Sequence, residues 1–433
     1  MGRPTIEPLP PVADGVGLPW DVAVEDPVAA LAAARRDHGD TFVVDSGPDR
    51  YLFTFSPVGV AAFYALPEEQ ASKGVADWRM LRRKLPDEVF SGRRTLPHEL
   101  FGRDDVATYL AHLERSLDDA LAELDDRGEL DVFAFTRRLG HRMGLASWGG
   151  PGAASGDRFD QLAAAFDRLD GSDAFVHPDA MAAVAASDKA DERTALSEIA
   201  GLIATSLGEL PAHREEHGLF ARMADRWDDV PADERSTGVA FDLVLVHVAS
   251  MSNMFAALGW SIVDLVGHPD ATAAVAAGDR ALAERCALES TRLAQRSIMA
   301  RYVLAAVELD VGDAVHHVEP GATIATLLPL TNTTAAPGLD RWDPDRWTRR
   351  RLTDAGALPA PELVTAFGHG KHTCPAQPFS LAAMTAALVR LTRDFTLTPA
   401  WTDAPGPVRA QIGGVARAAG PCLLRYERRS SIS

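Results

Sequence analysis

The stretch FGHGKHTCPA, Phe367–Ala376, decides how the rest of this 433-residue sequence is interpreted. It places Cys374 on a glycine-bearing loop, just before a helix that the apolar pattern predicts from about Pro378 to Arg393. Glycine allows backbone conformations in which N–H groups point at the sulfur, and a helix N-terminus adds positive potential. Both effects lower the pKa of a thiol, so we expect Cys374 to be a thiolate suited to the axial position of an iron ion.

Two other interpretations of this loop stay open. His369, His372 and Cys374 could form a three-ligand metal site, although a fourth ligand is missing and the spacing matches no zinc pattern. Alternatively, Cys374 could be a catalytic nucleophile with His372 as its base.

A second motif lies upstream, where Glu289 and Arg292 stand three residues apart on a helix predicted over Leu282–Ile298. At that spacing the two side chains share one face and can pair, which on an exposed helix would mean little. Arg301 follows nine residues after Arg292, and Arg346 lies in the stretch before the cysteine loop.

Together these motifs resemble those of the cytochrome P450 family, whose haem-binding signature is Phe-x-x-Gly-x-basic-x-Cys-x-Gly/Ala. The matching positions hold Phe367, Gly370, His372, Cys374 and Ala376, the last in place of the commoner glycine. The resemblance covers nearly the whole chain, from Arg35–Val44 to the C-terminal region. It implies a mainly α fold with a small β-rich lobe (α+β), in which residues 1–433 form one domain around one haem b.

The resemblance also implies a role for each matching residue. Cys374 is expected to be the axial ligand of the haem iron, with Phe367 shielding it and Gly370 in the same cofactor-binding loop. His372 and Arg301 are expected to contact the haem propionates. The set Glu289, Arg292 and Arg346 is expected to form a buried ion triad that fixes the register of that side of the haem.

The longest predicted element, about Ala232–Gly267, is apolar on almost every face, which is typical of a helix that crosses the interior of a large domain. Small side chains form a stripe along one face of this helix. Such a stripe either lets a bulky group approach the helix or allows tight packing against another helix. The stripe consists of Ala249, Ser250, Asn253, Ala256 and Ala257. By resemblance, Ala249 faces the haem.

This helix departs from the family at the pair that usually holds an acid and a threonine, where Ser252 and Asn253 stand instead. We expect both to act on the distal side of the haem, but an amide does not relay a proton as a carboxylic acid does. Three interpretations stay open. Asn253 bonds a neighbouring backbone carbonyl; or monooxygenation draws protons through Ser250, Ser252, water or a substrate hydroxyl; or the chain rearranges peroxides, as prostacyclin and allene oxide synthases do.

Local signals predict the remaining elements. A helix opens at Asp26-Pro27 and stops at Gly39, and another opens at Ser56-Pro57. Between them, Thr41–Phe55 is expected to form a hairpin. Further expectations are a helix over Leu110–Asp126, a loop over Trp148–Gly156, strands over Val303–Val311 and Ala322–Leu328, and a terminal hairpin over Ile412–Glu427.

Composition narrows the class of protein. The hydrophobic fraction of 46% indicates a folded globular chain, and three scattered cysteines indicate a reducing, cytoplasmic setting without a disulfide framework. A formal charge of −18 argues against nucleic-acid binding. We see no signal peptide, and no apolar run approaches the roughly 18 residues of a membrane span. A monomer is expected.

A basic island interrupts the acidic chain and comprises Arg341, Arg346, Arg349, Arg350 and Arg351. By resemblance it lies near the proximal haem face, where an acidic ferredoxin would dock. We therefore expect monooxygenation of a small, largely apolar metabolite of natural-product type, with electrons from NAD(P)H through a ferredoxin reductase and ferredoxin. The alternatives are isomerisation, dehydration or peroxide-driven oxidation without a redox partner, and a ligand-binding relative without turnover.

The resemblance places the substrate pocket among segments that are mostly apolar or small. These are Ser72–Arg83, Phe159–Met181, Ala249–Asn253, the stretch after Arg301 and the turn Gly413-Gly414-Val415.

Overall fold

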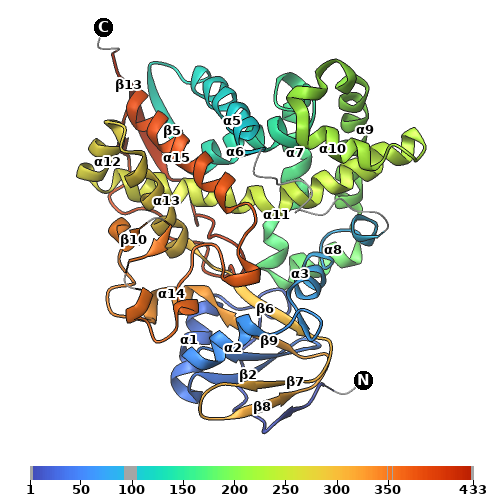
Figure 1. The fold of residues 1–433 in the computed structure, drawn as a ribbon, viewed down its shortest axis with the longest axis vertical. Helices are drawn as coiled ribbons and strands as arrows, with labels where there is room; N and C mark the ends of the chain where they lie inside the picture. Colours follow the sequence, from blue (N-terminus) through green and yellow to red (C-terminus); the bar gives the residue numbers. More distant parts are fainter. Residues whose placement is uncertain (1–2, 92–104, 349, 354, 431–433) are drawn as a thin grey trace.

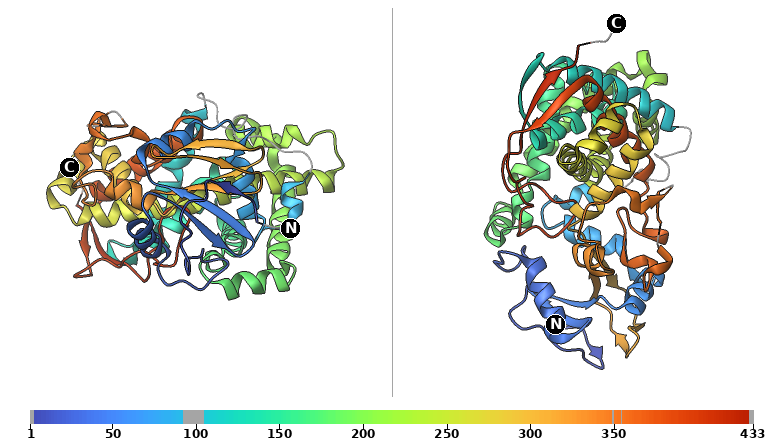
Figure 2. Two further views of the ribbon diagram at one scale, coloured as in Figure 1. Left: turned by 90° about the horizontal axis from the view of Figure 1, so that it is seen from below. Right: turned by 90° about the vertical axis from the view of Figure 1, so that its left-hand side faces the viewer.

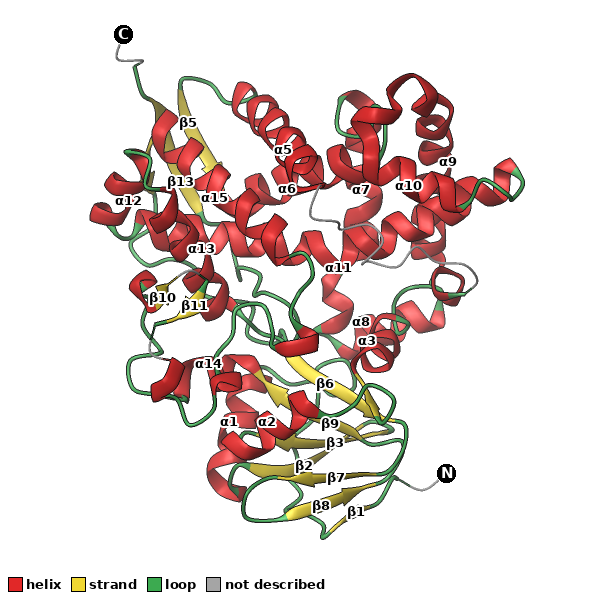
Figure 3. Cartoon of the chain, in the orientation of Figure 1, coloured by secondary structure: helices red, strands yellow, loops and turns green. Residues whose placement is uncertain are grey.

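Helices gather in one part of the molecule and most strands in another, at the top and bottom of Figure 1 and in red and yellow in Figure 3. The computed structural model describes residues 3–91, 105–348, 350–353 and 355–430. The helical part contains α5 (Asp105–Ala122), α6 (Val132–Trp148), α7 (Gly156–Asp170), α8 (Pro178–Ala186), α9 (Ala190–His213), α10 (Gly218–Arg226), α11 (Ala232–Val266), α12 (Pro269–Ala276), α13 (Arg280–Ala294) and α15 (Gln377–Asp394). This is the mainly α fold with a small β-rich lobe that the sequence predicts.

The long helix α11 runs through the middle of the helical part, packed against α6, α9 and α13 (Figure 1). Its contact with α6 is close, because a Cβ atom on Gly140 would lie 2.2 Å from the Phe255 ring and one on Gly259 would lie 2.6 Å from Phe133. Within the described residues, α11 is the one helix that is long and apolar enough to cross a membrane. In the most apolar 18-residue stretch of α11, 56% is buried inside the protein. The predicted position of this helix in the interior therefore explains why it is so apolar.

The main sheet combines segments that are distant in the sequence, in the order β2–β3–β9–β6–β4. The predicted hairpin is β2 (Thr41–Ser46) with β3 (Asp49–Thr54). Strand β3 runs parallel to β9 (Thr323–Leu327), and β6 (Ile298–Val303) pairs antiparallel with β9 and with β4 (Ala71–Ser72). Seen from below in Figure 2, these blue and orange strands lie side by side.

Short helices and a second sheet complete the β-rich part. α1 (Pro27–His38), α2 (Pro57–Ala65), α3 (Lys73–Leu81) and α14 (Leu328–Thr334) each contact strands of the main sheet. The second sheet has the order β1–β8–β7 and consists of β1 (Ile6–Glu7), β7 (Val307–Asp310) and β8 (Val315–Val318).

A third sheet lies at the opposite end of the molecule, beside the C-terminus (Figure 1). Here β13 (Leu423–Arg428) pairs with β12 (Phe395–Pro399) on one side and with β5 (Arg127–Asp131) on the other. A short pair, β10 (Trp347–Thr348) and β11 (Arg351–Leu352), stands apart from it.

Several helix boundaries agree with the sequence, both with and without a capping side chain. Asp26 and Ser56 accept backbone N–H groups at the starts of α1 and α2, and α11 and α15 match their predicted ranges closely. The helix predicted over Leu282–Ile298 extends too far, since α13 ends at Ala294 and Ile298 already begins β6. Likewise, the range Val303–Val311 is not one strand but the end of β6, a turn and β7.

The terminal hairpin predicted over Ile412–Glu427 is wrong. Residues 412–422 contain no strand and make only isolated bridges, at Val415 and Ala418, and β13 finds its partners in β12 and β5 instead. Gly413 and Gly414 hold φ angles of +121° and +62°, which bend the backbone into a tight turn rather than continuing a strand.

Candidate cofactor and substrate site

The loop that carries Cys374 depends on one glycine more than the motif alone suggests. The backbone N–H of Cys374 donates to the carbonyl of Phe367 at 2.8 Å, which closes the loop. Gly368 has φ +84°, and a Cβ there would lie 2.4 Å from the carbonyl oxygen of His372. Gly370 also adopts a positive φ, +56°, at the start of the short helix Gly370–His372, but space around it is open. Gly368 is thus the position where any side chain is excluded.

A buried asparagine anchors this loop to the helical part. The Asn332 side chain accepts the N–H of Thr365 at 2.8 Å and donates to the carbonyls of Thr365 and Arg292 at 2.9 and 3.0 Å. Gln295 adds a bond from its Nε2 to the carbonyl of Ala366 at 2.8 Å. The base of the cysteine loop is therefore tied to the C-terminal end of α13.

Burial raises the pKa of the Cys374 thiol. The backbone N–H groups of Ala376 and Gln377 and the charge of Lys73 act in the opposite direction but do not outweigh desolvation. A bound cation at the sulfur would supply the missing positive charge, because a thiol that coordinates a metal is deprotonated outright.

Cys374 faces a cavity of about 800 Å³, here called the inner chamber. Across it lie small and apolar residues of α11, among them Ala249, Ser250 and Ala257. Two cationic side chains, Lys73 and Lys371, and the imidazole of His372 also line it. One sulfur ligand, an apolar space of this size and basic groups in its wall fit a large flat porphyrin with two carboxylates. The residues present therefore suit a haem.

The other two interpretations of the loop find no support. Among the described residues no group of three or more His, Cys, Asp or Glu side chains could hold a metal ion, and His369 instead contacts the carbonyl of Val364. His372 is not placed as a base for Cys374, since its Nε2 lies 2.6 Å from Nη1 of Arg301.

Arg301 is fully buried and does not line the inner chamber. Its guanidinium donates to the carbonyls of Ala71, Phe63 and Leu66 as well as to His372. Burial, followed by the neighbouring Arg301 charge, lowers the pKa of His372. The structure thus places His372 at the chamber and Arg301 behind it.

Glu289 and Arg292 meet in the interior, both with no exposed surface. Arg292 donates to both carboxylate oxygens, at 2.8 and 2.7 Å, and Arg346 approaches Glu289 at 3.3 Å. The carboxylate also accepts the indole N–H of Trp347 at 2.9 Å and the backbone N–H of Asp343 at 3.1 Å. The expected triad is present, and these two further donors extend it.

The side chains of Ser252 and Asn253 form hydrogen bonds with backbone groups. The Ser252 hydroxyl donates to the carbonyl of Val248 at 3.2 Å, and Nδ2 of Asn253 donates to the carbonyl of Ala249 at 3.3 Å. In addition, Oδ1 of Asn253 accepts the backbone N–H of Val415 at 2.8 Å, a contact between distant segments. Ala249 and Asn253 line the inner chamber, whereas Ser252 does not.

A second cavity of about 640 Å³, here called the outer chamber, adjoins the first. Aromatic and aliphatic side chains supply much of its wall, including Trp20, Phe133, Phe175 and Ile412. Segments that the sequence expects around the substrate meet here: α3, the end of α7, α11, the start of β6 and the turn at Gly413.

Lys73, within the predicted pocket segment Ser72–Arg83, lines both chambers. Sequence reasoning missed two residues of the site: Asp242, a buried acid of α11 that lines the inner chamber, and Asn332, which anchors the cysteine loop. Asp242 lies eleven residues, or about three helical turns, before Asn253, so the helical period could have indicated that both residues share one face of α11. No local pattern marks Asn332.

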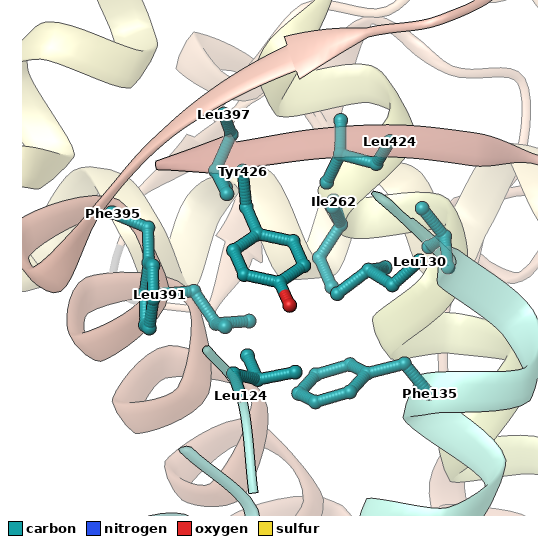
Figure 4. Close-up of a pocket in the computed structure, with 10 residues that line it drawn as sticks. Leu124, Leu130, Phe135, Ile262, Leu391, Phe395, Leu397, Leu424 and Tyr426 are labelled. Carbon is teal, nitrogen blue, oxygen red and sulfur yellow. The ribbon is translucent and has the colours of Figure 1, made fainter. Parts of the chain in front are cut away.

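A third space is too small to bind a ligand. Figure 4 shows the Tyr426 ring pointing among apolar side chains that include Leu124, Phe135 and Leu391. The cavity measures about 10 Å³, near the limit for one water molecule. It is a packing gap between α15, α6 and the third sheet.

Two side chains of the basic island form ion pairs within the protein. Arg346 turns inward to Glu289, and Arg350 pairs with Glu284 at 2.7 Å. Arg341 and Arg351 are exposed, and Arg349 lies outside the described residues.

Comparison with known proteins gives three further findings. No family model matches the sequence. The human protein 24-hydroxycholesterol 7-alpha-hydroxylase is 23% identical over 210 residues, and this match spans 43% of its length and 43% of this chain. The crystal structure of CYP175A1 from Thermus thermophillus superposes with a TM-score of 0.66 at 22% identity, over 93% of this chain and 95% of that one.

Proposed function

The chain has the cytochrome P450 fold, and from that premise we propose that it is a haem-thiolate monooxygenase in which residues 1–433 enclose one haem b. One observation carries the proposal: Cys374, on its glycine loop, faces a large apolar chamber across from the small-residue stripe of α11. A thiolate-bound haem in this place supplies the activation of dioxygen when it is reduced.

Each residue around the proposed haem site has its own role. Cys374 provides the ligand, and the N–H groups of Ala376 and Gln377 stabilise its negative charge. Lys73 and Lys371 would supply cations, and His372 an imidazole hydrogen-bond donor, to carboxylates in the chamber. Arg301 orients His372 by donating to its Nε2, so we assign it a positioning role behind the propionate site. Phe367 lines the chamber beside the sulfur, as a shielding residue would.

Anaerobic reduction under carbon monoxide tests the proposal directly. We expect a strongly red-shifted Soret band in the wild type and its loss in Cys374→Ser, with absorption at the position of a neutral-ligand haem. A wild-type protein that binds haem without the red-shifted band would show that Cys374 is not the ligand.

The substrate that we propose is a small, largely apolar metabolite, and the electron donor a ferredoxin with its NAD(P)H-dependent reductase. The apolar walls of the outer chamber support the first part. The exposed Arg341 and Arg351, on a chain of charge −18, support the second. A cytoplasmic location and a role in natural-product metabolism accord with this assignment.

A second candidate function is chemistry without a redox partner, such as isomerisation, dehydration or peroxide-driven oxidation. The residues Ser252 and Asn253 favour this candidate. Neither is an acid, although the family usually carries an acid at this place, and both side chains are hydrogen-bonded to backbone groups. Single-turnover assays separate the two. Product that forms with reduced ferredoxin and dioxygen supports monooxygenation, whereas product that forms only from a peroxide supports the second candidate.

A further inference from the structure

The inner and outer chambers meet at a passage whose walls come from four segments. Ala249 and Asn253 of α11, Ser297 and Met299 at the start of β6, and Val415 of the Gly413 turn line both chambers. The α3 helix supplies the remaining shared residues. We call this passage the throat. The throat joins the outer chamber to the chamber that Cys374 lines.

A long-range hydrogen bond between α11 and the Gly413 turn lies on one side of the throat. Oδ1 of Asn253 accepts the N–H of Val415 at 2.8 Å, across 162 positions of sequence. Gly414 makes this approach possible, because a Cβ there would lie 2.5 Å from Oδ1 and its φ is +62°. Both amide ends of Asn253 are occupied, since Nδ2 donates to Ala249 of its own helix. The side chain is built as a tie between α11 and the turn.

The turn itself is held from the other side. Gly413 donates its N–H to the carbonyl of Arg296, and Ala416 donates to the carbonyl of Ala294, both at 2.8 Å. Trp260 of α11 donates its indole N–H to the carbonyl of Ala416 at 2.7 Å. The flanks of the turn are therefore fixed to the end of α13 and to α11. At the centre of the turn, the Gly414 carbonyl accepts the N–H of Arg296 at 2.8 Å and the Val415 carbonyl accepts Nε2 of Gln411 at 3.0 Å. The Val415 N–H, at the throat, is the group that Asn253 binds.

We propose that Asn253 is a positioning residue that sets the width of the throat by holding Val415 against α11. It selects slender, largely apolar substrates that extend from the outer chamber toward Cys374, and it excludes wide ones. The inference rests on the proposed function, because that function places the reaction in the inner chamber. The amide acts here as a structural tie and not as a proton donor.

The first measurement is hydrogen exchange of the haem-bound protein. In Asn253→Ala, the amide of Val415 should exchange about tenfold or more faster, because its partly buried hydrogen bond to Oδ1 is lost. The control is Ser261→Ala on the same helix, which removes a bond to its own-helix carbonyl of Ala257 outside both chambers. Unchanged exchange at Val415 in Asn253→Ala would refute the tie.

The second measurement compares azoles of different width by their spectral dissociation constants: imidazole, 4-phenylimidazole and the triaryl compound clotrimazole. Asn253→Ala should bind clotrimazole about tenfold more tightly, a change of about 1.4 kcal/mol. Its affinity for imidazole should stay within about twofold of the wild type, since a small ligand does not need the wider passage. Equal shifts for all three azoles, or none, would contradict a role in width.

A second variant breaks the Asn253–Val415 hydrogen bond by changing the turn instead of α11. Gly414→Ala pushes the backbone away from Oδ1, and its azole preference should change in the same sense as that of Asn253→Ala. Because both changes break one contact, the double variant should show little further change. If instead Asn253→Ala only raises peroxide release while exchange and azole preference stay at wild-type values, Asn253 handles protons and the inference fails. The carbon monoxide spectrum, recorded for each variant, reports separately on the proposed function.

Discussion

At the scale of single residues, Glu289 shows how a weak sequence motif gains meaning from burial. Its carboxylate has no exposed surface and accepts donors from Arg292, Arg346, Trp347 and the backbone of Asp343. A buried charge of this kind is stable only while its partners stay in place, so its value lies in fixing one arrangement of α13 and the segment before the cysteine loop.

We predict that Glu289→Gln destabilises the protein by about 3–5 kcal/mol, because an amide N–H group would replace one acceptor and leave Arg292 buried without its counterion. The control is Glu284→Gln on the same helix, whose partner Arg350 is exposed, and it should cost no more than about 1 kcal/mol. Urea unfolding followed by circular dichroism measures both. Equal losses in the two variants would mean that burial does not matter here.

A second buried acid gives a pH-dependent prediction. Burial raises the pKa of Asp264 to about 6, and a hydrogen bond from Ser290 only partly offsets this. Since the folded pKa lies above the unfolded value of 3.8, the contribution of this group is fully present below about pH 4 and is lost as pH rises through 6.

Asp264→Asn should therefore stabilise the protein at pH 7.5 by roughly 1–3 kcal/mol and make little difference below about pH 4. Thermal unfolding from pH 4 to 8 measures the difference. Asp403→Asn, in an exposed loop, controls for the loss of one carboxylate. A stability gain that is the same at every pH would contradict the assignment.

At the scale of elements, the packing of α6 on α11 depends on small residues at the contact. A Cβ at Gly140 would meet the Phe255 ring at 2.2 Å, and one at Gly144 would meet Met251 at 2.9 Å. Glycine lowers helix propensity, so its presence on this face indicates that close approach outweighs that cost.

Gly140→Ala should destabilise the protein by about 1–3 kcal/mol, because the added methyl group forces the helices apart. Gly201→Ala on α9 is the matched opposite, since nothing lies within 4 Å of its Cβ position. There the same substitution should stabilise by about 0.5–1 kcal/mol. Melting temperatures that shift in one direction for both variants would refute this account of the α6–α11 contact.

Elements were predictable where their signals are local. The caps at Asp26 and Ser56 and the period of α11 come from neighbouring residues, and these elements match the sequence. The end of α13 and the structure of Ile412–Glu427 depend on pairing with strands that are distant in the sequence. A local stretch of sequence does not reveal such partners. The site divides in the same way. Cys374 is marked by its own loop, whereas Asn332 and the Asn253–Val415 bond join the site only through tertiary contact.

At the scale of the whole molecule, charge is unevenly distributed. The chain carries a formal charge of −18, yet Arg341, Arg350 and Arg351 lie close together in the sequence before the cysteine loop. Attraction between a basic patch and an acidic partner speeds their encounter and weakens with salt.

The double variant Arg341→Glu/Arg351→Glu should slow electron transfer from a reduced acidic ferredoxin about tenfold or more at low salt, with little effect on azole binding. Stopped-flow reduction at low and high ionic strength measures the rate. Arg36→Glu/Arg425→Glu changes the net charge equally on other elements and should leave the rate near wild type. If both double variants slow it alike, net charge and not the island governs the encounter.

The sheet β12–β13–β5 has a consequence for synthesis in the cell. Strand β5 leaves the ribosome before most of the helical part, but the strand that completes it, β13, is made after α15. Until then the Arg127–Asp131 edge has no strand partner, and such an edge can pair with another chain. Production of this protein should therefore benefit from weak expression, because fewer chains started at once means a lower concentration of half-made chains that await their last strand.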